Sequence, residues 1–150
     1  MINPNIKTGS VSRPRWMIVD DNQDVLLLMR DIIEQCVEAD IQYFHSPHAA
    51  LATFTSAPEA FDFVITDLEM PGMSGLELGG ELRKLSPALK VLLLTGSQIL
   101  TRGEAVQKGF CGLLRKPFLI DSLQNALTTI GILKTPVENK SRNFQALTAA

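Results

Sequence analysis

The chain has 150 residues, 45% of them hydrophobic, which suits one domain with an ordinary core. Its 14 basic and 16 acidic residues are mixed along the sequence and give a formal net charge of -2, so composition offers no basis for direct nucleic-acid binding. The apolar runs are too short to span a membrane, and the first 14 residues lack the apolar stretch of a signal peptide. We therefore expect a cytoplasmic protein without membrane insertion.

The N-terminal part of the chain predicts a leader, a strand and a helix. Residues 1–14 are mostly polar, contain proline and glycine and show no period, so we interpret them as a flexible leader. Residues 16–19 form a compact apolar run, which predicts a strand. Apolar residues then recur at three- and four-residue steps through residues 25–36, predicting an amphipathic helix with Asn22 or Asp24 as its cap.

Four further apolar runs predict strands, each followed by residues typical of loops; they cover residues 41–44, 63–66, 91–94 and 112–115. Strands that alternate with helices favour an α/β fold, because each right-handed connection between parallel strands needs a helix to return the chain. We predict a doubly wound five-stranded parallel sheet flanked by helices on both faces. The domain should cover residues 15–133, and residues 134–150 form a C-terminal tail or the start of a linker.

The last three predicted helices differ in quality. The one after the third strand contains Gly79 and Gly80, each of which weakens a helix by about 1 kcal/mol relative to alanine. The next, over residues 100–108, contains Gly103 and has a weak apolar stripe, so we expect a short or locally mobile element. The final helix is predicted from a stripe of four apolar residues, Leu119, Leu123, Leu127 and Ile130.

The cysteines and histidines do not form a recognisable site. Cys36 and Cys111 have no histidine or second cysteine at metal-ligand spacing, and their apolar or glycine-rich surroundings favour buried, reduced thiols. His45 and His48 have no acidic or cysteine partner at such spacing, so we interpret them as surface or capping residues. Chemistry must therefore be sought among the other polar side chains.

Polar side chains follow four of the five predicted strands. Asp20 and Asp21 follow the first strand, and the third, fourth and fifth strands lead into Asp67, Thr95 and Lys116. The carboxyl ends of parallel strands meet at one edge of a sheet, so these groups should share one site. Like charges about 4 Å apart repel by about 4 kcal/mol at an effective dielectric near 20, so three adjacent carboxylates require a cation or raised pKa values. Magnesium suits the site because it prefers oxygen ligands and substrate phosphates.

This set of groups suits transfer of a phosphoryl group to an aspartate. Asp67 can attack as a carboxylate nucleophile while Lys116 and the metal neutralise the charge on the phosphoryl oxygens. Thr95 can donate its hydroxyl proton to one of those oxygens, and Gly96 allows backbone amides to approach closely. The modification adds roughly -1.5 to -2 charge, and a loop that reorients to meet it can switch a surface between two states.

Four segments resemble, in order, the receiver domains of two-component response regulators; they are Val19-Asp20-Asp21, Asp67-Leu68-Glu69-Met70-Pro71-Gly72-Met73-Ser74-Gly75, Leu94-Thr95-Gly96 and Lys116-Pro117-Phe118. The resemblance implies a flavodoxin-like receiver fold. It also implies that Asp67 accepts phosphate from a histidine kinase or a histidine phosphotransfer protein and that a downstream protein responds. Such a domain is not a metabolic enzyme, because it catalyses only its own phosphorylation and dephosphorylation.

The resemblance also assigns roles around the phosphoacceptor. Asp20, Asp21, Asp67 and the backbone carbonyl of Glu69 would hold Mg²⁺. The side chains that would contact the phosphate are those of Thr95 and Lys116, and the Lys116-Pro117 bond is expected to be cis.

One position departs from the family pattern. Receivers often have an aromatic residue three positions before the lysine, where this sequence has Leu113. Rotation of an aromatic ring toward a displaced Thr95 is therefore not expected. Together with the Gly103 interruption, this predicts intact phosphorylation with an altered or weak relay to the face formed by the fourth helix and fifth strand.

Two other functions are also compatible with the sequence. A degenerate receiver could serve as a docking module that works without phosphorylation. A phosphatase of the haloacid dehalogenase type also uses a strand-end aspartate and magnesium, but its motif has a second aspartate two positions later, where this chain has Glu69. The paired Asp20 and Asp21 have no place in that scheme.

Overall fold

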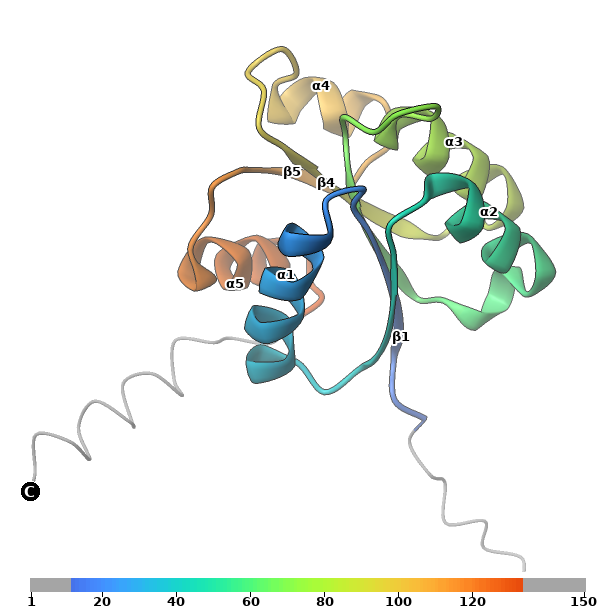
Figure 1. Ribbon diagram of the computed structural model, residues 1–150, viewed down its shortest axis with the longest axis horizontal. Helices are drawn as coiled ribbons and strands as arrows, with labels where there is room; N and C mark the ends of the chain where they lie inside the picture. The colour runs from blue at the N-terminus through green and yellow to red at the C-terminus, as the bar shows by residue number, and fades with distance from the viewer. Residues whose placement is uncertain (1–11, 134–150) are drawn as a thin grey trace, which may run out of the picture.

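The computed structural model describes residues 12–133 and shows one five-stranded parallel sheet with strand order β2-β1-β3-β4-β5 (Figure 1). The strands are β1 (Arg15–Val19), β2 (Asp40–Phe44), β3 (Phe63–Asp67), β4 (Lys90–Thr95) and β5 (Gly112–Arg115). All four neighbouring pairs are parallel, as predicted. Residues 1–11 of the expected leader and the expected tail over residues 134–150 lie outside the described residues.

Helices cover both faces of the sheet. They are α1 (Gln23–Cys36), α2 (Pro47–Ser56), α3 (Gly75–Leu85), α4 (Arg102–Gln107) and α5 (Ile120–Thr129), with a short 3-10 turn η1 (Pro58–Ala60) before β3. Figure 1 shows α1 and α5 on one side of the sheet and α2, α3 and α4 on the other. Because the chain leaves β1 first for β2 and later returns to β3 on its other side, the strand order reverses between β1 and β3, where ligands bind in such folds.

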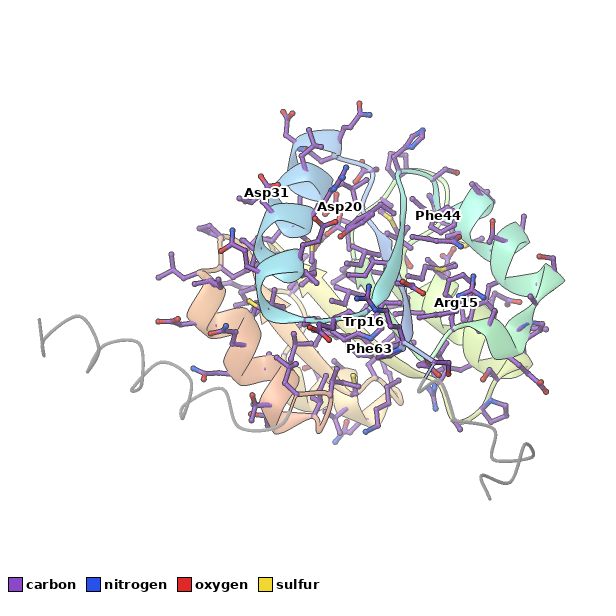
Figure 2. The ribbon with its side chains drawn as sticks, turned by 90° about the horizontal axis from the view of Figure 1, so that it is seen from below. Arg15, Trp16, Asp20, Asp31, Phe44 and Phe63 are labelled. Carbon is purple, nitrogen blue, oxygen red and sulfur yellow. The ribbon has the colours of Figure 1, made fainter. Side chains whose placement is uncertain are left out.

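Two hydrophobic layers follow from the alternation of side chains along the strands. Met17 and Val64 face the layer that contains α2 and α3, whereas Ile18 and Ile65 face the layer beneath α1 and α5. β3 is buried along its whole length because it lies in the middle of the sheet. Figure 2 shows Trp16 beside Phe63 at the start of these strands, their ring centroids 4.9 Å apart, with Asp20 at the other end of β1.

The helix ends confirm some expectations and correct others. Asn22 caps α1, since its side-chain oxygen accepts from the backbone amide of Asp24 at 2.9 Å. α4 has six residues, so it is short as predicted. Leu119 does not belong to the buried stripe of the last helix: it occupies the N-cap position of α5 and is 75% exposed. A capping residue precedes the helical turns, so its side chain does not face the sheet.

The cysteines are free, as expected, but neither is fully buried. Cys36 lies in the last turn of α1, where its Sγ accepts a hydrogen bond from Nε2 of Gln124 at 3.2 Å. Cys111 precedes β5, and burial raises the pKa of its thiol to about 11. Cys111 packs at the edge of the layer beneath α1 and α5 rather than at its centre.

Gly79 and Gly80 do not have the same effect on α3, although both are helix-interior glycines. A Cβ added at Gly79 would lie 2.3 Å from Cε1 of Phe110, a ring that is only 5% exposed. A Cβ at Gly80 would meet no atom within 4 Å. Gly79 is thus required for close packing, whereas Gly80 only costs backbone entropy.

Alanine at these two positions should therefore change stability in opposite directions. We expect Gly79→Ala to lower the free energy of unfolding by about 1 to 3 kcal/mol through overpacking. Gly80→Ala should raise it by about 0.5 to 1 kcal/mol. Urea denaturation of the two variants measures both effects, and a shift of the same sign in both would contradict this packing argument.

Candidate functional site

Three charged side chains meet at the carboxyl edge of the sheet. Asp20, directly after β1, is fully buried, and Asp67, at the end of β3, is 5% exposed. Lys116, directly after β5, reaches both: its Nζ donates to Oδ2 of Asp20 at 2.6 Å and to Oδ1 of Asp67 at 3.1 Å. The fold thus brings together residues that are 96 and 49 positions from the lysine in sequence.

Asp21 joins the two buried aspartates in one acidic cluster. One carboxylate oxygen from each of Asp20, Asp21 and Asp67 lies within 4.8 Å of the other two. The backbone amide of Asn22 donates to Oδ1 of Asp20 at 2.9 Å, which holds that carboxylate in place. Asp21 is exposed, so the cluster is open to solvent on its side.

Burial and neighbouring charges shift the pKa values of Asp67 and Lys116. Burial raises the pKa of Asp67 from its usual 3.8 to about 6; the hydrogen bond from Lys116 opposes this rise, and the charge of Asp20 adds to it. For Lys116, burial alone would lower the pKa, but the hydrogen bonds to Asp20 and Asp67 outweigh burial and raise it. Lys116 therefore stays charged, while Asp67 ionises at a cost that a nearby cation would reduce.

Thr95 lies at the same edge but is engaged elsewhere. Its buried hydroxyl, at the end of β4, donates to Oε1 of Glu69 at 2.6 Å and accepts from the backbone amide of Ser97 at 3.0 Å. Sequence reasoning considered only the backbone carbonyl of Glu69 and missed its side chain. No sequence signal pointed to this contact, because the parallel register that pairs Asp67 with Leu94 and brings Glu69 close to Thr95 is known only from the structure.

Gly75 sets the position of the backbone behind the phosphoacceptor candidate. It is the first residue of α3, and its amide donates to the carbonyl of Leu68 at 2.9 Å. A Cβ on Gly75 would lie 2.2 Å from the carbonyl oxygen of Asp67. From the sequence, Gly75 was expected only as the last residue of the family motif over residues 67–75, and its packing role was not predicted. Only a residue without a side chain allows α3 to begin so close to Asp67.

An open groove lies beside the acidic cluster. It has a volume of about 580 Å³, and its lining combines the polar residues Asp21, Glu69, Ser74 and Ser97 with the apolar residues Leu68, Met70, Pro71 and Ile99. The exposed side of the cluster, at Asp21, therefore borders this groove.

Comparison with known proteins agrees with this fold and shows the family. The family model for the response regulator receiver domain matches residues 16–128. The chain belongs to the response regulator receiver domain family. Its function is that of a phosphoacceptor signalling domain in a two-component system, and the phosphatase alternative is not favoured.

Curated relatives of this receiver domain are longer proteins. The C4-dicarboxylate transport transcriptional regulatory protein DctD of Rhizobium meliloti strain 1021 is 32% identical over 130 residues, covering 85% of this chain and 28% of that protein. The response regulator protein FleR of Pseudomonas aeruginosa is 45% identical over 74 residues, covering 49% of this chain and 15% of that protein. The chain thus spans less than a third of either relative.

Solved structures confirm the predicted receiver fold. A response regulator receiver domain protein from Clostridium thermocellum has a TM-score of 0.71 and 26% identity, covering 87% of this chain and 98% of that one. The CheX-CheY-BeF3-Mg complex from Borrelia burgdorferi gives a TM-score of 0.71 at 18% identity, covering 81% of this chain and 90% of that one.

Among the described residues, no helix is long and apolar enough to cross a membrane.

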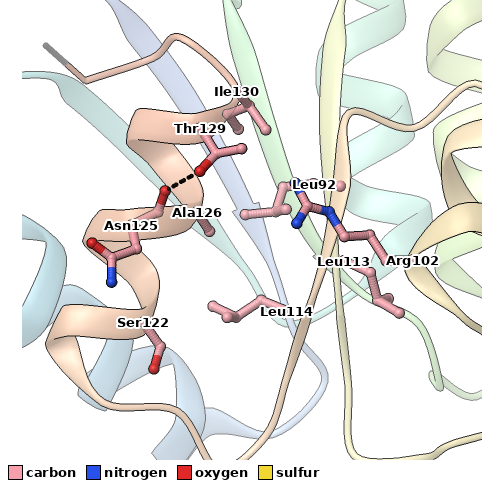
Figure 3. A pocket seen from close by; sticks show the side chains of 10 residues that line it. Leu92, Arg102, Leu113, Leu114, Ser122, Asn125, Ala126, Thr129 and Ile130 are labelled. Atoms are coloured by element: carbon pink, nitrogen blue, oxygen red, sulfur yellow. Dashed lines mark hydrogen bonds between the residues drawn. The ribbon is translucent and has the colours of Figure 1, made fainter.

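Two local features of the receiver domain concern the end of β5. The Lys116-Pro117 peptide bond is cis, as the resemblance implied. Leu113 is half-buried on β5 and lines a cavity of about 230 Å³ between β5 and α5. Figure 3 shows Leu113 near Arg102. The position where receivers often carry an aromatic ring is therefore occupied by a shorter aliphatic side chain.

Proposed function

We propose that Asp67 of this receiver domain accepts a phosphoryl group from a phosphohistidine of a histidine kinase or histidine phosphotransfer protein in a Mg²⁺-dependent reaction. The observation that carries the proposal is the contact of buried Asp67 with Lys116 inside a cluster of three carboxylates. We further propose that the reaction takes place in the cytoplasm and changes a surface read by a downstream protein. The domain would catalyse only its own phosphorylation and dephosphorylation.

The donor set fits Mg²⁺. Asp20, Asp21 and Asp67 offer oxygen atoms within 4.8 Å of one another, and Mg²⁺ prefers oxygen ligands while keeping several waters. These three carboxylates and the backbone carbonyl of Glu69 would hold the ion. When bound, the ion supplies positive charge that offsets the repulsion among the carboxylates and the charge of a phosphoryl group.

The chain's own groups account for the transfer. A carboxylate oxygen of Asp67 forms the new P–O bond while the P–N bond to the donor histidine breaks, and the bonding pair remains on the imidazole nitrogen. Lys116 is already within hydrogen-bond reach of both buried aspartates, so its charge is in place to stabilise a phosphoryl oxygen. Thr95 can serve the same group only after its hydroxyl leaves Glu69.

Intact-mass measurement after incubation with acetyl phosphate and Mg²⁺ tests the proposal. We expect the wild-type domain to gain the mass of one phosphoryl group and to lose it in acid, because the product is an acyl phosphate. Asp67→Asn should gain nothing, since an amide is not a nucleophile of this kind. Asp40→Asn, at the start of β2 and the opposite edge of the sheet, is the matched control and should react like wild type.

Failure of wild type to react, with acetyl phosphate and also with a phosphorylated kinase, would contradict the proposal. The docking module that works without phosphorylation would then be the better interpretation.

A further inference from the structure

Arg115 binds the loop that follows the Thr95 strand. It is the last residue of β5, directly before Lys116, and it pairs with Thr95 in the sheet register. Its Nη1 donates to the carbonyl of Ser97 at 2.6 Å, and its Nη2 donates to the carbonyl of Leu100 at 3.0 Å. One planar guanidinium thus holds two carbonyls of the loop over residues 96–101, which we call the β4–α4 loop.

Ser97 connects this arginine to the phosphoacceptor site. Its carbonyl accepts from Arg115, and its amide donates to Oγ1 of Thr95 at 3.0 Å. The hydroxyl of Thr95 in turn donates to Glu69 at 2.6 Å. If Thr95 turns its hydroxyl toward a phosphoryl group on Asp67, the contact with Glu69 is lost and the contact with Ser97 is disturbed.

The side chain of Arg115 lies on the same face of β5 as that of Leu113. Side chains two apart on a strand point to the same side, so Arg115 shares the side of Leu113, which packs on the layer beneath α2, α3 and α4. Leu113 has no ring and no hydrogen-bonding group with which to follow a displacement of Thr95. Arg115 has both a long side chain and existing bonds to the loop that would move.

We propose that Arg115 couples the β4–α4 loop to the state of Asp67, by holding the loop in the arrangement in which Thr95 is bound to Glu69. This inference rests on the proposed phosphorylation of Asp67 and names its regulation. Holding the loop lowers the fraction of molecules in the arrangement that can receive a phosphoryl group. The apparent affinity for a phosphoryl analogue falls in proportion to this fraction. Loss of Arg115 should therefore make the switch easier to turn on.

Hydrogen exchange of the unmodified protein tests whether the contact holds the loop. We expect amides within residues 96–101 to exchange about tenfold faster in Arg115→Met, because two hydrogen bonds from a charged donor are lost. Arg115→Lys should restore part of the protection, since an ammonium group lacks the two-pronged geometry of a guanidinium. Arg102→Met, which removes an exposed guanidinium from the first residue of α4, is the matched control and should leave the loop unchanged. Equal exchange in wild type and Arg115→Met would overturn the proposal.

The affinity for beryllofluoride with Mg²⁺, followed by calorimetry, tests the coupling between this loop and the Asp67 site. We expect Arg115→Met to bind about three- to tenfold more tightly than wild type. Loss of one positive charge alone would weaken the binding of an anion, so Arg102→Met should bind equally or more weakly. Unchanged or weaker binding by Arg115→Met would show that the contact has no effect on the Asp67 site and would overturn the proposed coupling. If wild type binds no beryllofluoride, the proposed phosphorylation fails and the coupling with it, whereas faster exchange in the variant would still establish the loop contact.

Discussion

Replacing Gly75 with alanine is expected to destabilise the domain by about 3 kcal/mol, the upper part of the range for overpacking. The added Cβ would lie 2.2 Å from the carbonyl oxygen of Asp67 and 3.0 Å from Cα of Leu68. Both atoms belong to the backbone, so no side-chain rotation can relieve the contact. Either the start of α3 or the end of β3 must move, and movement of β3 displaces the proposed phosphoacceptor.

Urea denaturation of Gly75→Ala measures this loss, and phosphorylation by acetyl phosphate in the folded fraction measures the displacement of Asp67. Gly80→Ala is the matched control, because it lies in the same helix and its added Cβ would meet no atom within 4 Å. The packing argument is wrong if the two variants unfold at the same urea concentration and accept phosphate at the same rate.

Asp67→Asn is expected to stabilise the metal-free domain above about pH 6, by up to about 3 kcal/mol. In the folded state the pKa of Asp67 is raised from 3.8 to about 6, mainly by burial. The folded protein thus binds this proton more tightly than the unfolded chain does, so stability falls as pH rises through this interval. The free-energy cost of burying the ionised carboxylate is complete above the pKa of the folded state and absent below the pKa of the unfolded state. An asparagine side chain does not ionise and has no such cost.

Urea denaturation in a chelating buffer from about pH 4 to about pH 8 measures this difference for wild type and Asp67→Asn. The stability difference should grow with pH across the interval and then level off. Adding Mg²⁺ should stabilise wild type more than Asp67→Asn, since binding to the folded state raises its stability. A difference independent of pH would show that burial of the carboxylate carries no such cost.

The fold and the family were accessible from local sequence pattern. Short apolar runs that alternate with amphipathic segments predict parallel strands joined by helices. The carboxyl ends of such strands share one edge, so Asp20, Asp67 and Lys116 were expected to meet there, and Lys116 does contact both aspartates. These inferences succeed because strand period and strand direction are properties of short segments of chain.

Other features depend on contacts between segments far apart in sequence. The hydroxyl of Thr95 binds a carboxylate 26 positions away, and Arg115 binds a carbonyl 18 positions away. Gly79 and Gly80 are neighbours in one helix, yet only Gly79 lies against Phe110. A periodic pattern tells which side chains share a face, but the choice of hydrogen-bond partner and the free space around each Cα are decided only when the helices pack on the sheet.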